Sequence, residues 1–137
     1  MPMGSGLALL EVSLDGGAFA PYTSSLTVTD GVHTLAARTK DNAGNVTEST
    51  QTIKVDTVTP TIALSLTGAQ GTGGWYISNV NVSATTSDSG SGINTLQVSQ
   101  DGSAYSNYQS PITFSDGVHT YRFKTTDNAG NVTETAL

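Results

Sequence analysis

The two histidines have the widest chemical range of any side chains in this sequence. His33 and His119 lie 86 positions apart, and each follows an Asp-Gly-Val segment. A histidine acts as a general base, a proton shuttle or a metal ligand when a suitable partner group lies close to it. No serine or carboxylate stands at a spacing that suggests a catalytic triad, and the two histidines belong to different units of a repeat. We therefore expect both to be structural residues, hydrogen-bonded at the start of a strand, and we expect the chain not to be an enzyme.

Aspartates near turns are the next candidates, because calcium prefers carboxylate and carbonyl oxygen ligands. Asp41, Asp56 and Asp127 are the candidate calcium ligands, and Asp88 and Glu48 are further oxygen donors. No contiguous Asp-x-Asp-x-Asp loop is present. The alternative is that these carboxylates cap turns by accepting hydrogen bonds from backbone amides. Calcium is the one cofactor that the sequence leaves open.

Aromatic side chains offer a third kind of site, since flat rings stack on the apolar faces of sugars and exposed aromatic patches mark interaction sites. Tyr105 and Tyr108 have counterparts in the first half of the chain, which favours a packing role. Trp75 and Tyr76 lie in a segment without a counterpart. They are the candidate residues for binding a glycan or another ligand.

These candidates lie within an internal repeat. Shifting the sequence by 86 positions aligns residues 6–50 with residues 92–136 without a gap, and 24 of the 45 pairs are identical. Such a repeat is the signature of an array built from one structural unit. A residue kept in both copies is more readily explained by the fold than by a unique chemical site.

Each copy predicts the same local structure. Asp30-Gly31 and Asp116-Gly117 stand between alternating apolar runs, and an Asp-Gly pair there predicts a tight two-residue hairpin turn. The run that follows alternates, so one set of side chains faces a core: His33, Leu35, Ala37, Thr39 and Asp41 in the first copy, and His119, Tyr121, Phe123, Thr125 and Asp127 in the second.

The end of this run carries the segment Asp-Asn-Ala-Gly-Asn in both copies. Asp41 and Asp127 are expected to point inward and to accept hydrogen bonds from the amides of the following turn. Gly44 and Gly130 permit a positive φ there. With Asn45, Asn131 and the two histidines, these residues form the predicted structural set.

Composition excludes several classes of partner. The formal net charge is −6, with only five lysines and arginines, so neither nucleic acid nor an anionic membrane surface is an expected partner. No apolar run approaches the roughly 18 residues of a membrane-spanning helix, and no membrane insertion is expected. The absence of cysteine excludes disulfides and thiolate metal sites.

The alternating runs and their turns also predict the domain organisation. Short strands separated by Gly, Asp and Asn turns indicate an all-β sandwich. Residues 56–60 end in a proline and are the preferred boundary, which gives residues 7–56 as the C-terminal part of a first repeat and residues 57–137 as a second repeat that lacks most of its last strand. Residues 1–6 are interpreted as a cloning remnant. A boundary at residues 87–92 remains an alternative, in which residues 7–86 form a permuted sandwich.

The motifs quoted above make a resemblance specific. Asp15-Gly16 with Tyr22, the Gly-Val-His-Thr segment, the Asp-Asn-Ala-Gly-Asn segment and the Asp-Thr-Val-Thr-Pro joint resemble the bacterial immunoglobulin-like repeats of large surface and secreted proteins. The resemblance covers nearly the whole chain. It implies an immunoglobulin-like antiparallel β-sandwich fold, with one nearly complete unit and one partial unit.

For function, the resemblance implies a tandem structural or spacer module of an extracellular or cell-surface multidomain protein. Its partners would be neighbouring immunoglobulin-like repeats of the same chain. The alternative is an adhesive or carbohydrate-binding module that binds a glycan or a surface protein, with calcium as the candidate stabilising ion.

Overall fold

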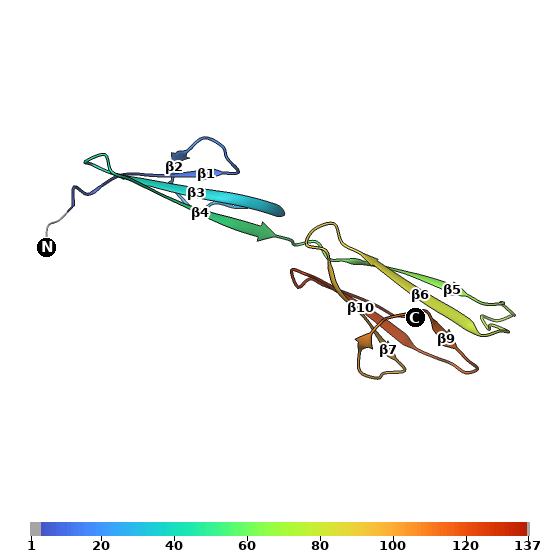
Figure 1. Cartoon of the computed structure of the whole chain (residues 1–137). Helices are drawn as coiled ribbons and strands as arrows, with labels where there is room; N and C mark the ends of the chain where they lie inside the picture. The colour runs from blue at the N-terminus through green and yellow to red at the C-terminus, as the bar shows by residue number, and fades with distance from the viewer. Residues whose placement is uncertain (1–3, 137) are drawn as a thin grey trace. The chain divides into compact units, whose positions relative to one another are not determined.

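The computed structural model describes residues 4–136, which form only β-strands and connecting turns (Figure 1). Residues 1–3, part of the segment interpreted as a cloning remnant, lie outside the described residues. The contacts divide the chain after Asp56 into unit 1 and unit 2. Every strand pair among these residues is antiparallel, in agreement with the predicted antiparallel all-β fold. No helix that could cross a lipid bilayer is present among the described residues.

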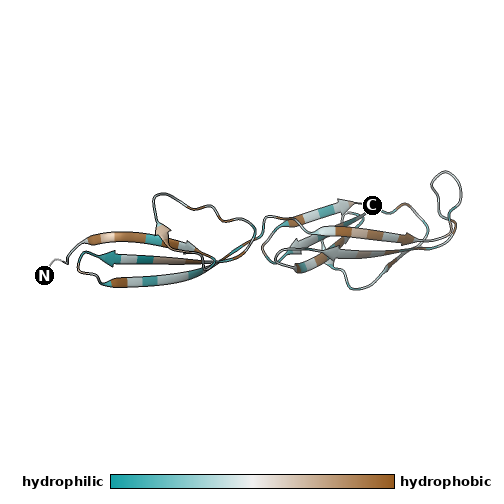
Figure 2. Cartoon of the chain, turned by 90° about the horizontal axis from the view of Figure 1, so that it is seen from above, coloured by the Kyte–Doolittle hydropathy of each residue, from teal (hydrophilic) through white to brown (hydrophobic). Residues whose placement is uncertain are grey.

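Unit 1 is a single sheet with the strand order β2-β1-β3-β4. Its strands are β1 (Leu7–Leu14), β2 (Ala20–Pro21), β3 (Gly31–Asp41) and β4 (Val46–Val55). Both apolar and polar residues occur along these strands, which Figure 2 shows as changes of colour along the arrows. Pro21 lies on the edge strand β2, where its missing N–H leaves no gap in a ladder.

Unit 2 contains two sheets, of strand orders β11-β10-β7-β8 and β5-β6-β9. The strands are β5 (Thr61–Thr67), β6 (Val80–Ser87), β7 (Ile93–Gln100), β8 (Ser106–Asn107), β9 (Ile112–Phe114), β10 (Tyr121–Asp127) and β11 (Val132–Ala136). Since β6 pairs with β5 on one side and with β9 on the other, the grouping of residues 7–86 into a permuted sandwich is not formed.

The core lies between the two sheets of unit 2, an arrangement consistent with a β-sandwich. Val80, Val82 and Ala84 of β6 form one buried cluster with Tyr121 and Phe123 of β10. Partly buried apolar side chains pack around this cluster, among them Ile62, Leu64, Leu96, Val98, Tyr108 and Phe114. Of the inward set predicted for the second copy, Tyr121, Phe123, Thr125 and Asp127 are buried in β10, whereas His119 lies before the strand and is only partly buried.

Asp15-Gly16 and Asp101-Gly102 form tight turns with positive φ at both central residues. Asp15 has φ 54° and Gly16 has φ 76°, and the amide of Gly17 donates to the carbonyl of Leu14 over 3.1 Å. Positive φ at both central residues defines the turn type that matches the twist of paired strands. This turn connects β1 to β2, and its equivalent at Asp101-Gly102 connects β7 to β8.

The prediction of tight hairpins at Asp30-Gly31 and Asp116-Gly117 is wrong. Asp116-Gly117 lies between β9, which pairs with β6, and β10, which pairs with β7, so the chain passes there from one sheet to the other. A periodicity of two shows that strands flank the pair but does not show which sheet each strand joins. Gly31 and Gly117 still need their glycine, since their φ values are 133° and 126°.

Candidate functional site

The segment that follows β10 surrounds one buried carboxylate. Asp127 is 1% exposed, and its Oδ1 accepts hydrogen bonds from the backbone amides of Ala129, Gly130 and Asn131 over 2.8–2.9 Å. Its Oδ2 accepts from the side-chain amide of Asn131 over 2.8 Å. Gly130 has φ 104°, which lets the turn fold back over the carboxylate. Both carboxylate oxygens are therefore used in holding the turn.

The same arrangement ends β3 in unit 1. Asp41 Oδ1 accepts from the amides of Ala43 and Asn45, and Oδ2 accepts from the side-chain amide of Asn45 over 2.8 Å. These donors, the Asn45 side chain first, hold the pKa of Asp41 below its ordinary value. Gly44 has φ 95°. The carboxylates at both strand ends thus do what the turn-capping alternative predicts.

Residues before β1 belong to this arrangement as well. The side-chain amide of Asn42 donates to the carbonyl of Ser5, and the amide of Ala43 donates to Ser5 Oγ. Asn128 and Ala129 make the same two bonds to Ser91. A cloning remnant does not explain this match, so Ser5 and Gly6 are better treated as part of the repeated unit.

Each histidine bridges an aspartate and a backbone carbonyl. In unit 1, His33 Nδ1 lies 2.7 Å from Asp15 Oδ2, and Nε2 lies 2.9 Å from the carbonyl oxygen of Thr29. In unit 2, His119 Nδ1 lies 3.4 Å from Asp101 Oδ2, and Nε2 lies 3.1 Å from the carbonyl oxygen of Ser115. Both ring nitrogens face acceptors, so the protonated imidazolium satisfies the site best.

The electrostatics of the pair agree with this geometry. The Asp15 carboxylate raises the pKa of His33, and the His33 imidazole lowers the pKa of Asp15. In unit 2, Asp101 raises the pKa of His119, while the amide of Thr120 and then His119 lower the pKa of Asp101. An imidazolium whose two N–H groups are both committed has no lone pair for base catalysis or metal ligation.

The aspartate partners of the histidines were not among the predicted site residues. Both copies contain the aspartate, Asp15 or Asp101, 18 positions before the histidine. The other oxygen of each carboxylate accepts from the amide of Thr34 or Thr120 over 2.9 Å. The turn aspartate therefore also anchors the start of the next long strand, and its retention in both copies was the available signal.

Of the three candidate calcium ligands, Asp127 lies beside a further aspartate of unit 2. Asp88 and Asp127 each have a carboxylate oxygen within 4.8 Å of the other. Asp88 Oδ2 accepts from the amides of Gly90 and Gly92, whereas its buried Oδ1 has no hydrogen-bond partner among the described residues. Oxygen donors so close together suit a hard cation such as calcium. Asp41 holds its own turn in unit 1 and is not one of this group.

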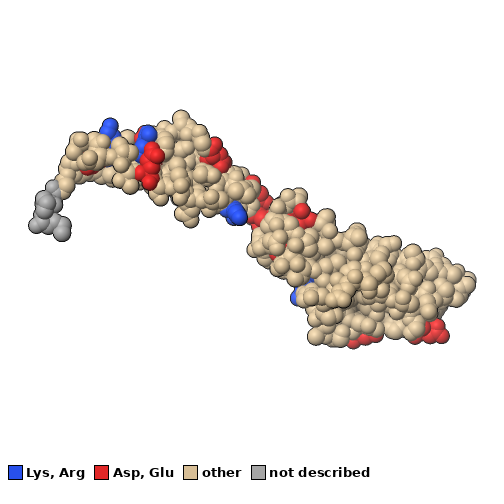
Figure 3. Space-filling model, viewed as in Figure 1, with Lys and Arg blue, Asp and Glu red and all other residues tan. Residues whose placement is uncertain are grey.

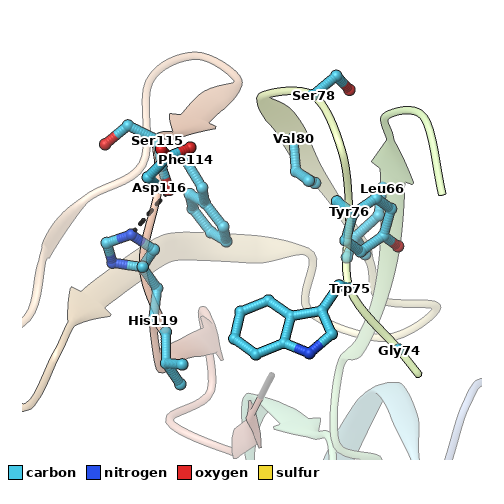
Figure 4. Close-up of a pocket in the computed structure, with 12 residues that line it drawn as sticks. Leu66, Gly74, Trp75, Tyr76, Ser78, Val80, Phe114, Ser115, Asp116 and His119 are labelled. Atoms are coloured by element: carbon cyan, nitrogen blue, oxygen red, sulfur yellow. Dashed lines mark hydrogen bonds between the residues drawn. The ribbon is translucent and has the colours of Figure 1, made fainter. Parts of the chain in front are cut away.

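Trp75 and Tyr76 line a hollow in unit 2 of about 620 Å³. The tight turn at Gly73 and Gly74, whose φ values are 65° and 83°, delivers the chain to Trp75. The amide of Trp75 donates to the carbonyl of Thr72 over 3.2 Å. Figure 4 shows the Trp75 indole facing the hollow from the segment before β6, with His119 and Phe114 across it.

The two aromatic candidates differ in exposure. Trp75 is 62% exposed, while Tyr76 is partly buried and packs against the core cluster. The hollow is lined by apolar groups from Leu66, Val80, Phe114 and Val118 and by the polar edge of Ser115, Asp116 and His119. An exposed indole beside polar groups suits a ring-shaped ligand. Tyr76 is explained by packing.

Charged side chains do not add a further site. On the face seen in Figure 3, lysine and arginine are few and do not gather into a patch. Arg38 binds Glu11 within its own sheet, with Nη2 2.7 Å from Oε1.

Comparison with known proteins finds no matching family model and no significantly similar curated protein.

Replacing the buried carboxylate should destabilise unit 2. Asp127→Ala leaves three turn amides without their acceptor, and we expect the free energy of unfolding to fall by about 1–3 kcal/mol. Chemical denaturation of the chain and the variant measures this loss. Repeating both titrations with calcium and with EDTA separates the two roles, since a bound ion would stabilise only the unsubstituted chain. An unchanged midpoint would contradict the capping role.

The histidine pairs predict a stability optimum in mildly acidic solution. The pKa of His119 is raised in the folded state. Its contribution to the free energy of unfolding is therefore complete below pH 6.5, the unfolded pKa, and is lost as the pH rises through the folded pKa. The contribution of Asp101 to the free energy of unfolding is present above pH 3.8, the unfolded pKa, and is lost as the pH falls through the lowered folded pKa. Thermal unfolding of unit 2 should therefore give a lower Tm at about pH 8.5 than at about pH 6. His119→Gln should flatten this difference, and a variant with the same pH dependence would refute the assignment.

Proposed function

We propose that this chain is a non-catalytic structural module, a spacer of immunoglobulin-like repeats in an extracellular or cell-surface multidomain protein. The observation that carries the proposal is how unit 2 joins its first and last segments. Thr133 Oγ1 donates to the carbonyl of Pro60 over 2.6 Å, and the side-chain amide of Asn131 donates to the carbonyl of Val58 over 3.2 Å. Tension applied through the two ends of the unit would load this contact directly.

The polar residues common to both copies support the same conclusion. Asp15 and Asp101, His33 and His119, and Asp41 and Asp127 bind turn amides, backbone carbonyls or one another at matching positions. A catalytic centre needs polar groups with unused hydrogen-bonding capacity that converge on a substrate. The repeated groups are instead used to fix turns and strand starts, as a module selected for rigidity requires.

The composition fits a surface-exposed bacterial array. The sequence contains no cysteine, is rich in small polar residues and repeats with a period of 86 residues. In such arrays, stability is approximately a sum over units and their nearest-neighbour interfaces. The proposed partners are accordingly neighbouring repeats of the same polypeptide.

Mechanical unfolding tests the spacer proposal. Thr133→Val removes the bond to Pro60 and should cost about 1 kcal/mol, which corresponds to a roughly fivefold faster unfolding of unit 2 under load. Thr67→Val, on the exposed end of β5, is the matched control and should unfold at the original rate. Single-molecule force spectroscopy measures both. Equal rates for Thr133→Val and the original chain would remove the basis of the proposal.

The alternative is an adhesive or carbohydrate-binding module, and the hollow beside Trp75 is the observation that favours it. The neighbouring carboxylates of Asp88 and Asp127 in unit 2 would in that case provide calcium stabilisation.

A glycan array decides between the spacer and the adhesive module. The spacer proposal expects no glycan to bind the chain more strongly than it binds Trp75→Ala. Ile77→Ala is a suitable control, since Ile77 is 75% exposed and does not line the hollow. Binding that Trp75→Ala weakens by about tenfold, equivalent to about 1.4 kcal/mol, and that Ile77→Ala retains would establish the adhesive alternative.

A further inference from the structure

We propose that the apolar face of the unit 1 sheet is a binding surface for a β-hairpin of the β5–β6 type. Unit 2 is the internal reference for this inference, since it contains the same sheet together with the hairpin that covers it. The inference rests on this comparison and does not depend on the proposed spacer role.

The two sheets are equivalent strand by strand. The order β2-β1-β3-β4 in unit 1 corresponds to β8-β7-β10-β11 in unit 2. The register is also the same: Val12 pairs with Ala37, and its counterpart Val98 pairs with Phe123. The face that unit 2 buries against β5 and β6 can therefore be identified in unit 1 residue by residue.

The equivalent residues differ in exposure. Tyr121, Phe123, Thr125 and Asp127 are between 0% and 2% exposed in unit 2. Their counterparts Leu35, Ala37, Thr39 and Asp41 all remain partly exposed in unit 1. In unit 1 the only buried described residue is Ser13, which lies on β1. The unit 1 face thus carries residues at the positions of the unit 2 core, but these residues are not fully buried.

The core of unit 2 shows what is missing. Seven members of its core come from segments that unit 1 also contains. The other six come from residues 57–87, which have no counterpart among the described residues of unit 1. These six are Ile62, Leu64, Tyr76, Val80, Val82 and Ala84. The seven counterparts in unit 1 are all apolar or aromatic: Leu10, Val12, Tyr22, Leu26, Val28, Leu35 and Ala37. A sheet with such a face needs a second layer to bury it.

Residues 26–28 give independent support. Their counterparts form β9, in which Phe114 pairs with Val80 and Ile112 pairs with Val82. In unit 1 the same segment forms no strand, and Leu26 is 49% exposed. A segment that is a strand in one copy and irregular in the other differs by the absence of its pairing partner. An incoming strand can supply those backbone hydrogen bonds by β-augmentation.

The unit 2 contacts define the register of the proposed complex. A hairpin strand equivalent to β6 would pair with residues 26–28, with its Val80 position opposite Val28 and its Val82 position opposite Leu26. The amide at the Ala84 position would donate to the Tyr22 hydroxyl, as Ala84 does to Tyr108 over 3.2 Å. The Thr86 position would reach Thr39, as Thr86 reaches Thr125 over 2.8 Å.

A hairpin fits this surface better than a second copy of the same sheet. Two unit 1 sheets packed face to face would bury Leu10 and Leu35, but neither would offer a strand for residues 26–28. A hairpin provides both an apolar layer and a strand edge. We therefore assign the hairpin as the occupant and treat self-association as an outcome that would overturn the assignment.

The first experiment uses the full chain and a synthetic peptide of residues 57–87 as the probe, followed by amide NMR. We expect shifts at Leu26, Val28 and Leu35, and amide exchange at residues 26–28 that is slowed by at least about tenfold, since pairing protects amides from opening. The control peptide carries Val82→Asp, which places a charge where unit 2 is fully buried. It should cause no shift in unit 1.

A linked version keeps the test independent of peptide solubility. A second copy of residues 57–91 is placed directly before Gly6, at the spacing that these residues have before Gly92. Unit 1 should then show the same protection, and the extension carrying Val82→Asp should not provide it.

Three results would overturn the proposal. The first is an unprotected segment 26–28 in both formats. The second is equal protection by the Val82→Asp hairpin, which would indicate non-specific adhesion. The third is concentration-dependent dimerisation of the chain alone, measured by sedimentation, that protects Leu10 and Leu35, which would identify a second copy as the occupant.

Discussion

A β-sheet with one apolar face has to bury that face, and this constraint governs both units of the chain. Unit 2 satisfies it with the β5-β6-β9 sheet, so that Val82 and Phe123 are completely buried. Unit 1 has the same strands and register, yet the corresponding side chains remain partly exposed. The sequences that form the two sheets are closely similar, so the difference in burial comes from the second sheet that covers unit 2.

The polar network acts within that constraint. At the end of β3 and of β10, a carboxylate accepts hydrogen bonds from the amides of the following turn. Near the start of each of these strands, a histidine forms hydrogen bonds with a second carboxylate and with a backbone carbonyl. In unit 1 this network forms although the apolar face is only partly buried. It is therefore local to the strand ends and does not depend on a second layer. The histidines and the aspartates at the strand ends, which have the widest chemical range in the sequence, thus serve to hold turns and strand starts.

The sequence predicted the class of the fold and the direction of the strands' side chains, because both follow from alternation and turn residues. It predicted Asp127 as an inward carboxylate correctly, since a period of two determines the face on which a residue lies. It failed at Asp116-Gly117, where alternation on both sides cannot show that the chain changes sheets. It also missed the Asp101–His119 pair, because a contact over 18 positions depends on how β7 and β10 align.

Side-chain volume bears on which hairpin would suit unit 1. Leu35 and Ala37 stand where unit 2 has Tyr121 and Phe123, so the unit 1 face carries much less bulk at its centre. Protein interiors are packed nearly as densely as organic crystals, and an unfilled volume in the core is destabilising. A hairpin identical to β5–β6 would leave space above Ala37. The hairpin that fits unit 1 best should therefore carry larger side chains at the positions of Val82 and Ala84, which makes each sheet selective for its own covering layer even though the strand pairing is shared.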